Sequence, residues 1–256
     1  MTTTLQSSTQ AAHAEYVLRL GDSALILGQR LSEWCGHGPV IEEDIALTNI
    51  ALDLIGQARL LLTHVGRLDG SGRSEDQLAF LRSDREYRSL TLCELPNGDF
   101  GRTILRNFLF AAWQAPLWER LADSADRELA AIAAKSAKET RYHLQHAGEW
   151  TLRLGDGTEG SHARMQRALD TLWPYTAELF APGALDADAA GIGPAWPSLQ
   201  PAWEAAVLPL LAEATLAVPA RTPFLSRGSE GLHSEHLGHL LAEMQYLQRA
   251  YPGANW

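Results

Sequence analysis

A glutamate and a histidine lie on one predicted helix at a spacing that brings their side chains together. Glu139 and His143 are four residues apart, so both side chains can share one helix face and form a local hydrogen-bonded pair. A bundle of four helices can hold a di-iron centre when two helices supply glutamates and the other two supply Glu-x-x-His motifs. Such a centre would need acidic residues near the middle of each long helix.

The residues at the middle of the long helices are neutral instead. Carboxylates bridge the two irons and each imidazole completes the coordination of one iron, so one histidine without a carboxylate cannot hold two irons. The sequence therefore predicts a degenerate metal site, with no metal and no catalytic residue in this chain. Its six positions are Leu27, Leu54, Gln57, Ala111, Thr140 and His143.

Other acidic residues on or beside these helices are interpreted as surface charges or internal polar pairs, because acidic side chains on helices are usually solvated. They are Asp22, Glu33, Asp53, Glu94, Glu139 and Glu149.

A histidine- and glutamate-rich cluster near the C-terminus has spacings that a zinc site can use. It consists of His233, Glu235, His236, His239 and Glu243. It lacks the HExxH order, in which two histidines four residues apart enclose a glutamate. Ser234 and Glu235 shortly after Gly231 also mark a helix start, and we favour this structural interpretation.

An arginine-rich segment is the best candidate for binding an anionic group such as a coenzyme A phosphate. Arginines three residues apart can line one face of a short helix and bind phosphate oxygens in pairs. The alternative, which we rate higher, is that these arginines pair with Asp84, Glu86 and neighbouring acids. The candidate contact residues are Arg82, Arg85, Glu86, Tyr87, Arg88 and Ser89.

The elements that would position these residues are helices. Apolar residues recur at steps of three and four over segments 17–34, 47–65, 104–122 and 129–150, which predicts four long helices. A short charged unit is expected at 75–90 and shorter helices at about 161–180, 202–217 and 234–250, with a loop over 181–200. Strand patterns are nearly absent. The prediction is an all-α fold, a four-helix bundle with additional C-terminal helices, with residues 1–12 as a mobile tail and 13–256 as one domain.

Composition excludes several classes of function. The 256 residues include 31 Asp and Glu against 21 Lys and Arg, which is unsuited to general nucleic-acid binding or to an anionic membrane surface. Two cysteines cannot build a disulfide framework and fit a reducing compartment. No dinucleotide fingerprint, P-loop, nucleophile elbow, signal peptide or stretch of about 20 apolar residues is present, so we expect a cytoplasmic location.

Seven short motifs carry a resemblance to a known family. The sequence resembles the C subunits (PaaC type) of the bacterial phenylacetyl-CoA epoxidases, which are multicomponent monooxygenases. The matching blocks follow one another over most of the chain, and segment 181–200 matches least. They are LRLGD at 18–22, EWCGH at 33–37, LDLIGQAR at 52–59, LPNG at 95–98, KETRYH at 138–143, LHSEHLG at 232–238 and AEMQYLQR at 242–249.

This resemblance implies a ferritin-like fold and a non-catalytic role. It implies a partner, the ferritin-like catalytic A subunit, which would carry the di-iron centre, together with further oxygenase subunits and a reductase. The complex would epoxidise the aromatic ring of phenylacetyl-CoA, whose CoA group would lie near the arginine-rich segment. In this interpretation His143 is a remnant of the ligand set that the catalytic relative retains.

Two alternatives stay open at this point. The chain could be a self-sufficient metal-dependent oxygenase that uses Glu139, His143 and C-terminal ligands, or a homomeric helical binding protein. Iron analysis and association with a second ferritin-like chain would separate these alternatives from the subunit interpretation.

Overall fold

The structure, a computed structural model, describes residues 2–182 and 191–254, with side chains from residue 9 onward. The described elements are helices, and one isolated bridge between Arg227 and Leu232 is the only extended pairing among these residues. The predicted all-α fold is confirmed. The described chain forms two compact units, one holding the residues up to Pro96 and from Arg227 onward, the other those from Asn97 to Ser226.

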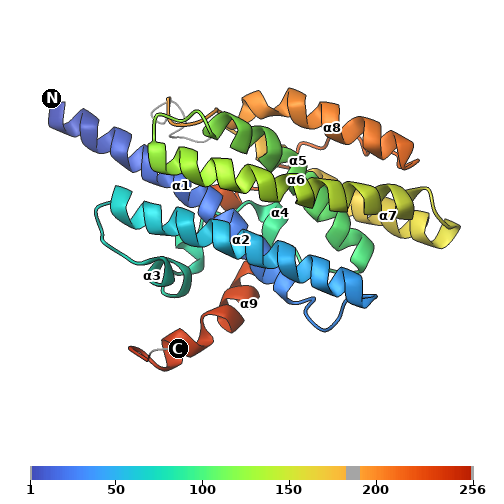
Figure 1. Cartoon of the computed structure of the whole chain (residues 1–256), viewed down its shortest axis with the longest axis horizontal. Helices are drawn as coiled ribbons and strands as arrows, with labels where there is room; N and C mark the ends of the chain where they lie inside the picture. The colour runs from blue at the N-terminus through green and yellow to red at the C-terminus, as the bar shows by residue number, and fades with distance from the viewer. Residues whose placement is uncertain (1, 183–190, 255–256) are drawn as a thin grey trace. The chain divides into compact units, whose positions relative to one another are not determined.

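The first unit is built on two long helices that lie side by side, α1 (Thr2–Ser32) and α2 (Ile41–Leu68) (Figure 1). They are antiparallel, because Gln10 near the start of α1 donates a hydrogen bond to the carbonyl of Leu68 at the end of α2. Farther along the pair, a Cβ on Gly28 would lie 3.3 Å from the backbone carbonyl oxygen of Ala51, so the two backbones approach closely there. Three acidic residues in the first turn of α2 complement its helix dipole.

Shorter helices complete the first unit. Ser74 caps α3 through a capping box with Gln77, and Ser234 caps α9 by accepting from the backbone N–H of His236, which confirms the helix start predicted there. These elements are α3 (Glu75–Phe80), η1 (Asp84–Glu86), α4 (Thr91–Glu94), η4 (Gly228–Glu230), α9 (Glu235–Met244) and α10 (Tyr246–Ala250).

The second unit is built on α5 (Phe100–Leu121) and α6 (Arg127–Gly155), which are also antiparallel. Phe100 at the start of α5 packs edge-to-face on Trp150 near the end of α6, with 5.3 Å between ring centroids. Asp126 caps α6 by accepting from two backbone N–H groups. The remaining elements are α7 (Glu159–Leu172), η2 (Trp173–Phe180), η3 (Trp196–Leu199) and α8 (Gln200–Glu213).

Several predicted boundaries shift. Helix α1 begins at Thr2, so the predicted tail over residues 1–12 is helical where the structure describes it, and its mobility stays a prediction. The helix expected over 161–180 is α7 followed by the 3₁₀ segment η2, because Pro174 lacks the N–H that an α-helix needs. The segment 234–250 divides into two helices at Gln245. Of the predicted loop 181–200, residues 183–190 lie outside the described residues.

Helix α2 is more apolar than expected. Among the described helices it alone is long and apolar enough to cross a membrane by length and composition, and about half of its most apolar window is buried within the protein. A core helix of a soluble protein passes the same test. The apolar residues of α2 that are not buried therefore need an explanation.

Candidate functional site

The predicted mid-helix positions of the first unit are occupied by apolar or neutral side chains that are buried. Leu27 on α1 and Leu54 on α2 are buried, and Gln57, one turn after Leu54, is fully buried. None of these three side chains carries a charge that could balance a metal ion. A di-iron centre does not fit this helix pair, because it needs carboxylate oxygens.

The corresponding positions of the second unit are also buried. Ala111 on α5 offers no ligand atom, and Thr140 and His143 on α6 are at most 3% exposed. The Oγ1 atom of Thr140 has no hydrogen-bond partner among the described residues. Glu139, expected beside His143, pairs with Lys135 one turn earlier. Of Ala111, Thr140 and His143, only His143 offers a nitrogen or carboxylate atom that could bind iron. The residues at these positions therefore do not fit a di-iron centre either.

Buried carboxylates do occur in the described chain, and each has protein partners. They are Asp22, Glu94 and Glu178. Glu178 accepts a hydrogen bond of 2.7 Å from the Ser226 hydroxyl within the second unit. Glu94 accepts from the backbone N–H of Ser234 and lies 2.8 Å from the His233 ring. These carboxylates are held by protein groups, as buried charges must be.

His233 belongs to this polar arrangement rather than to a metal cluster. Its Nδ1 contacts Glu94 and its Nε2 lies 3.0 Å from the Tyr87 carbonyl, so both ring nitrogens are engaged. Glu235, His239 and Glu243 are exposed on α9 and His236 is half-buried. The structure therefore supports a structural role for His233.

The arginine-rich segment does not form one exposed face, which corrects the geometry on which the predicted anion contact rested. Arg82 is 3% exposed and its guanidinium pairs with Asp22 of α1, sixty residues earlier. Arg88 pairs with Glu15 at 2.8 Å. The arginines thus do pair with acids, but with acids of α1 instead of the neighbouring Asp84 and Glu86.

The other members of the predicted anion site are placed differently from one another. Tyr87 and Ser89 are fully buried, and the Glu86 carboxylate caps the short η1 helix by accepting from Ser83. Arg85 is exposed. A contact between coenzyme A and this segment stays a prediction, and Arg85 is the cation that remains accessible for it.

A buried network surrounds Arg82. The guanidinium carbon lies 4.2 Å from the Tyr87 ring centroid, the Tyr87 hydroxyl donates to the Ala79 carbonyl, and the Gln245 amide donates to the carbonyls of Ala79 and Arg82. Burial disfavours the charged form of Arg82, but the charge of Asp22 and its hydrogen bonds outweigh burial and raise the pKa of Arg82. The network ties α1, the 78–89 segment and the C-terminal helices together.

Alkaline pH is expected to destabilise this network through Tyr87. Burial, and then the charge of Asp22, raises the pKa of the Tyr87 hydroxyl well above its usual value of 10.0. Above that pH the unfolded chain loses the proton while the folded chain keeps it, so the free energy of unfolding falls as pH rises past about 10. Urea denaturation at a series of pH values measures this slope. The Tyr87→Phe variant should show a shallower alkaline slope than the parent. An identical slope in the variant and the parent would contradict the assignment.

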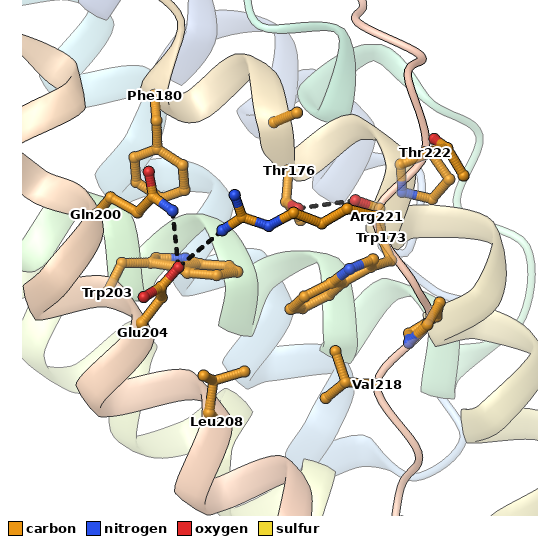
Figure 2. A pocket seen from close by; sticks show the side chains of 13 residues that line it. Trp173, Thr176, Phe180, Gln200, Trp203, Glu204, Leu208, Val218, Arg221 and Thr222 are labelled. Carbon is orange, nitrogen blue, oxygen red and sulfur yellow. Dashed lines mark hydrogen bonds and ion pairs between the residues drawn. The ribbon is translucent and has the colours of Figure 1, made fainter.

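A cavity of about 380 Å³ lies in the second unit, between η2, α8 and the segment 218–222 (Figure 2). Trp173 and Trp203 form its floor, with 5.6 Å between ring centroids, and Phe180 packs edge-to-face on Trp203. At the rim Glu204 accepts hydrogen bonds from Gln200 at 2.7 Å and from Arg221 at 2.9 Å. Sequence reasoning missed this site. The tryptophans between residues 173 and 203 were a signal for an aromatic pocket. No signal pointed to Arg221, because it lies in a segment without a helical or strand pattern.

Comparison with known proteins agrees with these structural features. Two antiparallel pairs of long helices, with neutral side chains at the mid-helix positions described above, define an all-α protein of the ferritin-like kind. A family model described as "Phenylacetic acid catabolic protein" matches residues 1–256, and the chain belongs to this family. The chain is 50% identical to the C subunit of the 1,2-phenylacetyl-CoA epoxidase of Escherichia coli (strain K12). The alignment spans 243 residues, which are 94% of this chain and 98% of that relative. The resemblance found from the motifs is thereby confirmed.

Proposed function

We propose that this chain is the non-catalytic structural subunit of a multicomponent monooxygenase that epoxidises the aromatic ring of phenylacetyl-CoA in aerobic phenylacetate degradation. Its task is to bind and support a ferritin-like A subunit that carries the di-iron centre, in a complex with further subunits and a reductase. Identity of 50% to an epoxidase C subunit over nearly the whole chain supports the assignment to such a complex. The observation that carries the non-catalytic role is the set of neutral residues at the centres of both helix pairs.

The outer face of α2 is the surface that fits a partner subunit. We call the outer row the residues Ile41, Ile45, Leu52, Gly56 and Leu60 on this face, whose four apolar side chains are exposed. Ile41 is 71% and Leu52 60% exposed, whereas the residues on the opposite face of α2 are buried. A helix that is apolar on both faces is typical of burial on both sides.

Gly56 adds a second observation about the outer row. It lies in the middle of α2, and a Cβ at this position would meet no atom within 4 Å. Glycine within a helix is destabilising relative to alanine by roughly 0.5–1 kcal/mol, so the fold of this chain gives no reason for it. A helix of another subunit that crosses at Gly56 would use the missing side chain to approach closely.

Hollows beside the outer row give such a helix places for its side chains. One of about 380 Å³ is lined by Ile55, Leu62 and Phe80, among others, and one of about 500 Å³ by Gly56, Leu60 and Thr63 with two charged neighbours. Acidic residues at 42–44 flank the N-terminal end of the row. This acidic flank favours a basic partner helix and disfavours an anionic membrane.

The decisive experiment is size-exclusion chromatography of this chain with the catalytic subunit, followed by iron analysis of the separated chains. We expect a complex that elutes earlier than either chain and iron in the partner. Stoichiometric iron in this chain would contradict the non-catalytic role, and failure to form any complex would remove the subunit interpretation.

The outer row is tested by Leu52→Glu, which places a charge in the apolar contact. We expect at least tenfold weaker association with the catalytic subunit and an unchanged unfolding midpoint, because Leu52 contacts little of its own chain. Leu247→Glu, at a comparably exposed leucine of α10, is the matched control and should leave association unchanged. Equal association of both variants and the parent would place the partner elsewhere, and loss of self-association in Leu52→Glu would instead assign the row to a second copy.

A further inference from the structure

The cavity of the second unit has the properties of a ligand site that the proposed function does not use. Its volume of about 380 Å³ falls in the range of small-molecule pockets, which are mostly apolar with a few placed polar groups. The floor is preorganised, because the Trp203 indole N–H donates to the Leu109 carbonyl at 2.9 Å and Trp203 is 3% exposed. The indole cannot turn without losing this hydrogen bond.

The aromatic floor selects a planar ring. Trp173 and Trp203 lie with their ring planes 37° apart, and Phe180 meets Trp203 at 67°, so a third ring can stack on one indole and contact the edge of another (Figure 2). Leu208 and Val218 close the side opposite Phe180 in the same view. A flat aromatic ring would contact all of these groups at once. A saturated ring of similar size is puckered and would stack less well on the indoles.

The polar groups at the rim select the charge of the ligand. Among the described residues that line the cavity, Arg221 is the one cation and Glu204 the one anion. Glu204 Oε1 already accepts from Gln200 and from Arg221 Nη2, whereas the Arg221 guanidinium forms no further hydrogen bond in the described chain. The guanidinium extends across the mouth above the indoles (Figure 2), with Nε and Nη1 still able to donate. Each of these free donors can bind a carboxylate oxygen through a charge-assisted hydrogen bond.

We propose that this cavity binds a small aromatic carboxylate, with its ring on the Trp173–Trp203 floor and its carboxylate on Arg221. The ion pair between Arg221 and Glu204 is solvent-exposed, with Arg221 77% exposed, so it is weak and holds the guanidinium over the mouth without blocking entry. Glu204 competes with the ligand for Arg221.

Three probes of the same size separate the contributions of ring and charge. Benzoate, benzamidine and cyclohexanecarboxylate are titrated into the full chain and followed by calorimetry and saturation-transfer NMR. We expect benzoate to bind, cyclohexanecarboxylate to bind at least fivefold more weakly because it cannot stack, and benzamidine to bind more weakly still because its cation faces Arg221. Absence of benzoate binding up to 10 mM, or tighter binding of benzamidine than of benzoate, would overturn the proposal.

Two rim variants test the assigned roles with opposite signs. Arg221→Ala should weaken benzoate binding at least tenfold, whereas Glu204→Gln should leave it equal or tighten it, because Arg221 is then released from its competitor. Arg141→Ala, at an exposed arginine of α6 outside the cavity, is the matched control and should change nothing. Benzoate binding that survives in Arg221→Ala or is lost in Glu204→Gln would overturn the proposal. The titration uses this chain without its partner, so its failure would leave the proposed function untouched.

Discussion

Replacing Arg82 by methionine is expected to destabilise the first unit by about 3–5 kcal/mol, the cost typical of leaving one charge of a buried pair without its partner. Asp22 is fully buried and faces the guanidinium of Arg82. Methionine fills a similar volume but cannot hydrogen-bond a carboxylate, so Asp22 must remain charged in an apolar site or take up a proton. Urea denaturation of the parent and the variant at neutral pH measures the difference.

The double variant Asp22→Asn/Arg82→Met is the control for this prediction. It removes both charges, so it should recover part of the loss, in line with buried ion pairs whose replacement by neutral residues is often tolerated. Recovery would not be complete, because Arg82 also donates to the carbonyls of Leu78 and Glu86, and methionine cannot replace these hydrogen bonds. A cost below about 1 kcal/mol for the single variant, the value of an exposed pair, would mean that water reaches Asp22.

The second large effect is expected from one glycine of α2. A Cβ on Gly66 would lie 2.0 Å from the carbonyl oxygen of Arg73. That distance is far below contact, and the obstacle is backbone, which cannot turn aside as a side chain can. Gly66→Ala should therefore destabilise the protein by about 1–3 kcal/mol or more, as overpacking does, and should loosen the loop that follows α2.

Gly56→Ala, ten residues earlier on the same helix, is the matched control and should have the opposite sign. With nothing within 4 Å, the added methyl group costs no contact, and alanine is favoured in a helix interior by roughly 0.5–1 kcal/mol. Thermal unfolding of both variants distinguishes the two expectations. If Gly66→Ala were as stable as the parent, the 66–73 contact would not be a fixed part of the fold.

Local spacing was enough to predict the helices but not their partners. The three-and-four repeat around Leu54 and His143 placed both residues in the core, where the structure finds them. The same reasoning failed for Arg82, because its partner Asp22 is sixty residues away and no periodicity links α1 to the segment that follows α3. Sequence spacing reports which face of a helix is buried, whereas the choice of ion-pair partner depends on tertiary packing.

The cavity shows the same limit. Trp173, Trp203 and Arg221 come from η2, α8 and an irregular segment, so no local pattern unites them. The proposed ligand site follows from the ring geometry and from the donors that Arg221 leaves free.

The contacts that complete the first unit have a consequence for folding during synthesis on the ribosome. His233 and Ser234 contact Glu94, Gly228 donates to Thr91, and Gln245 reaches back to Ala79. The second unit is therefore an insertion within the first, and its residues are all synthesised before the last contacts of the first unit exist. We expect the second unit to fold earlier during translation. The packing of α1 and α2 is completed only after the C-terminal helices have left the ribosome. The apolar outer row of α2 is exposed throughout that interval, which makes early capture by a partner chain or a chaperone an advantage for this protein.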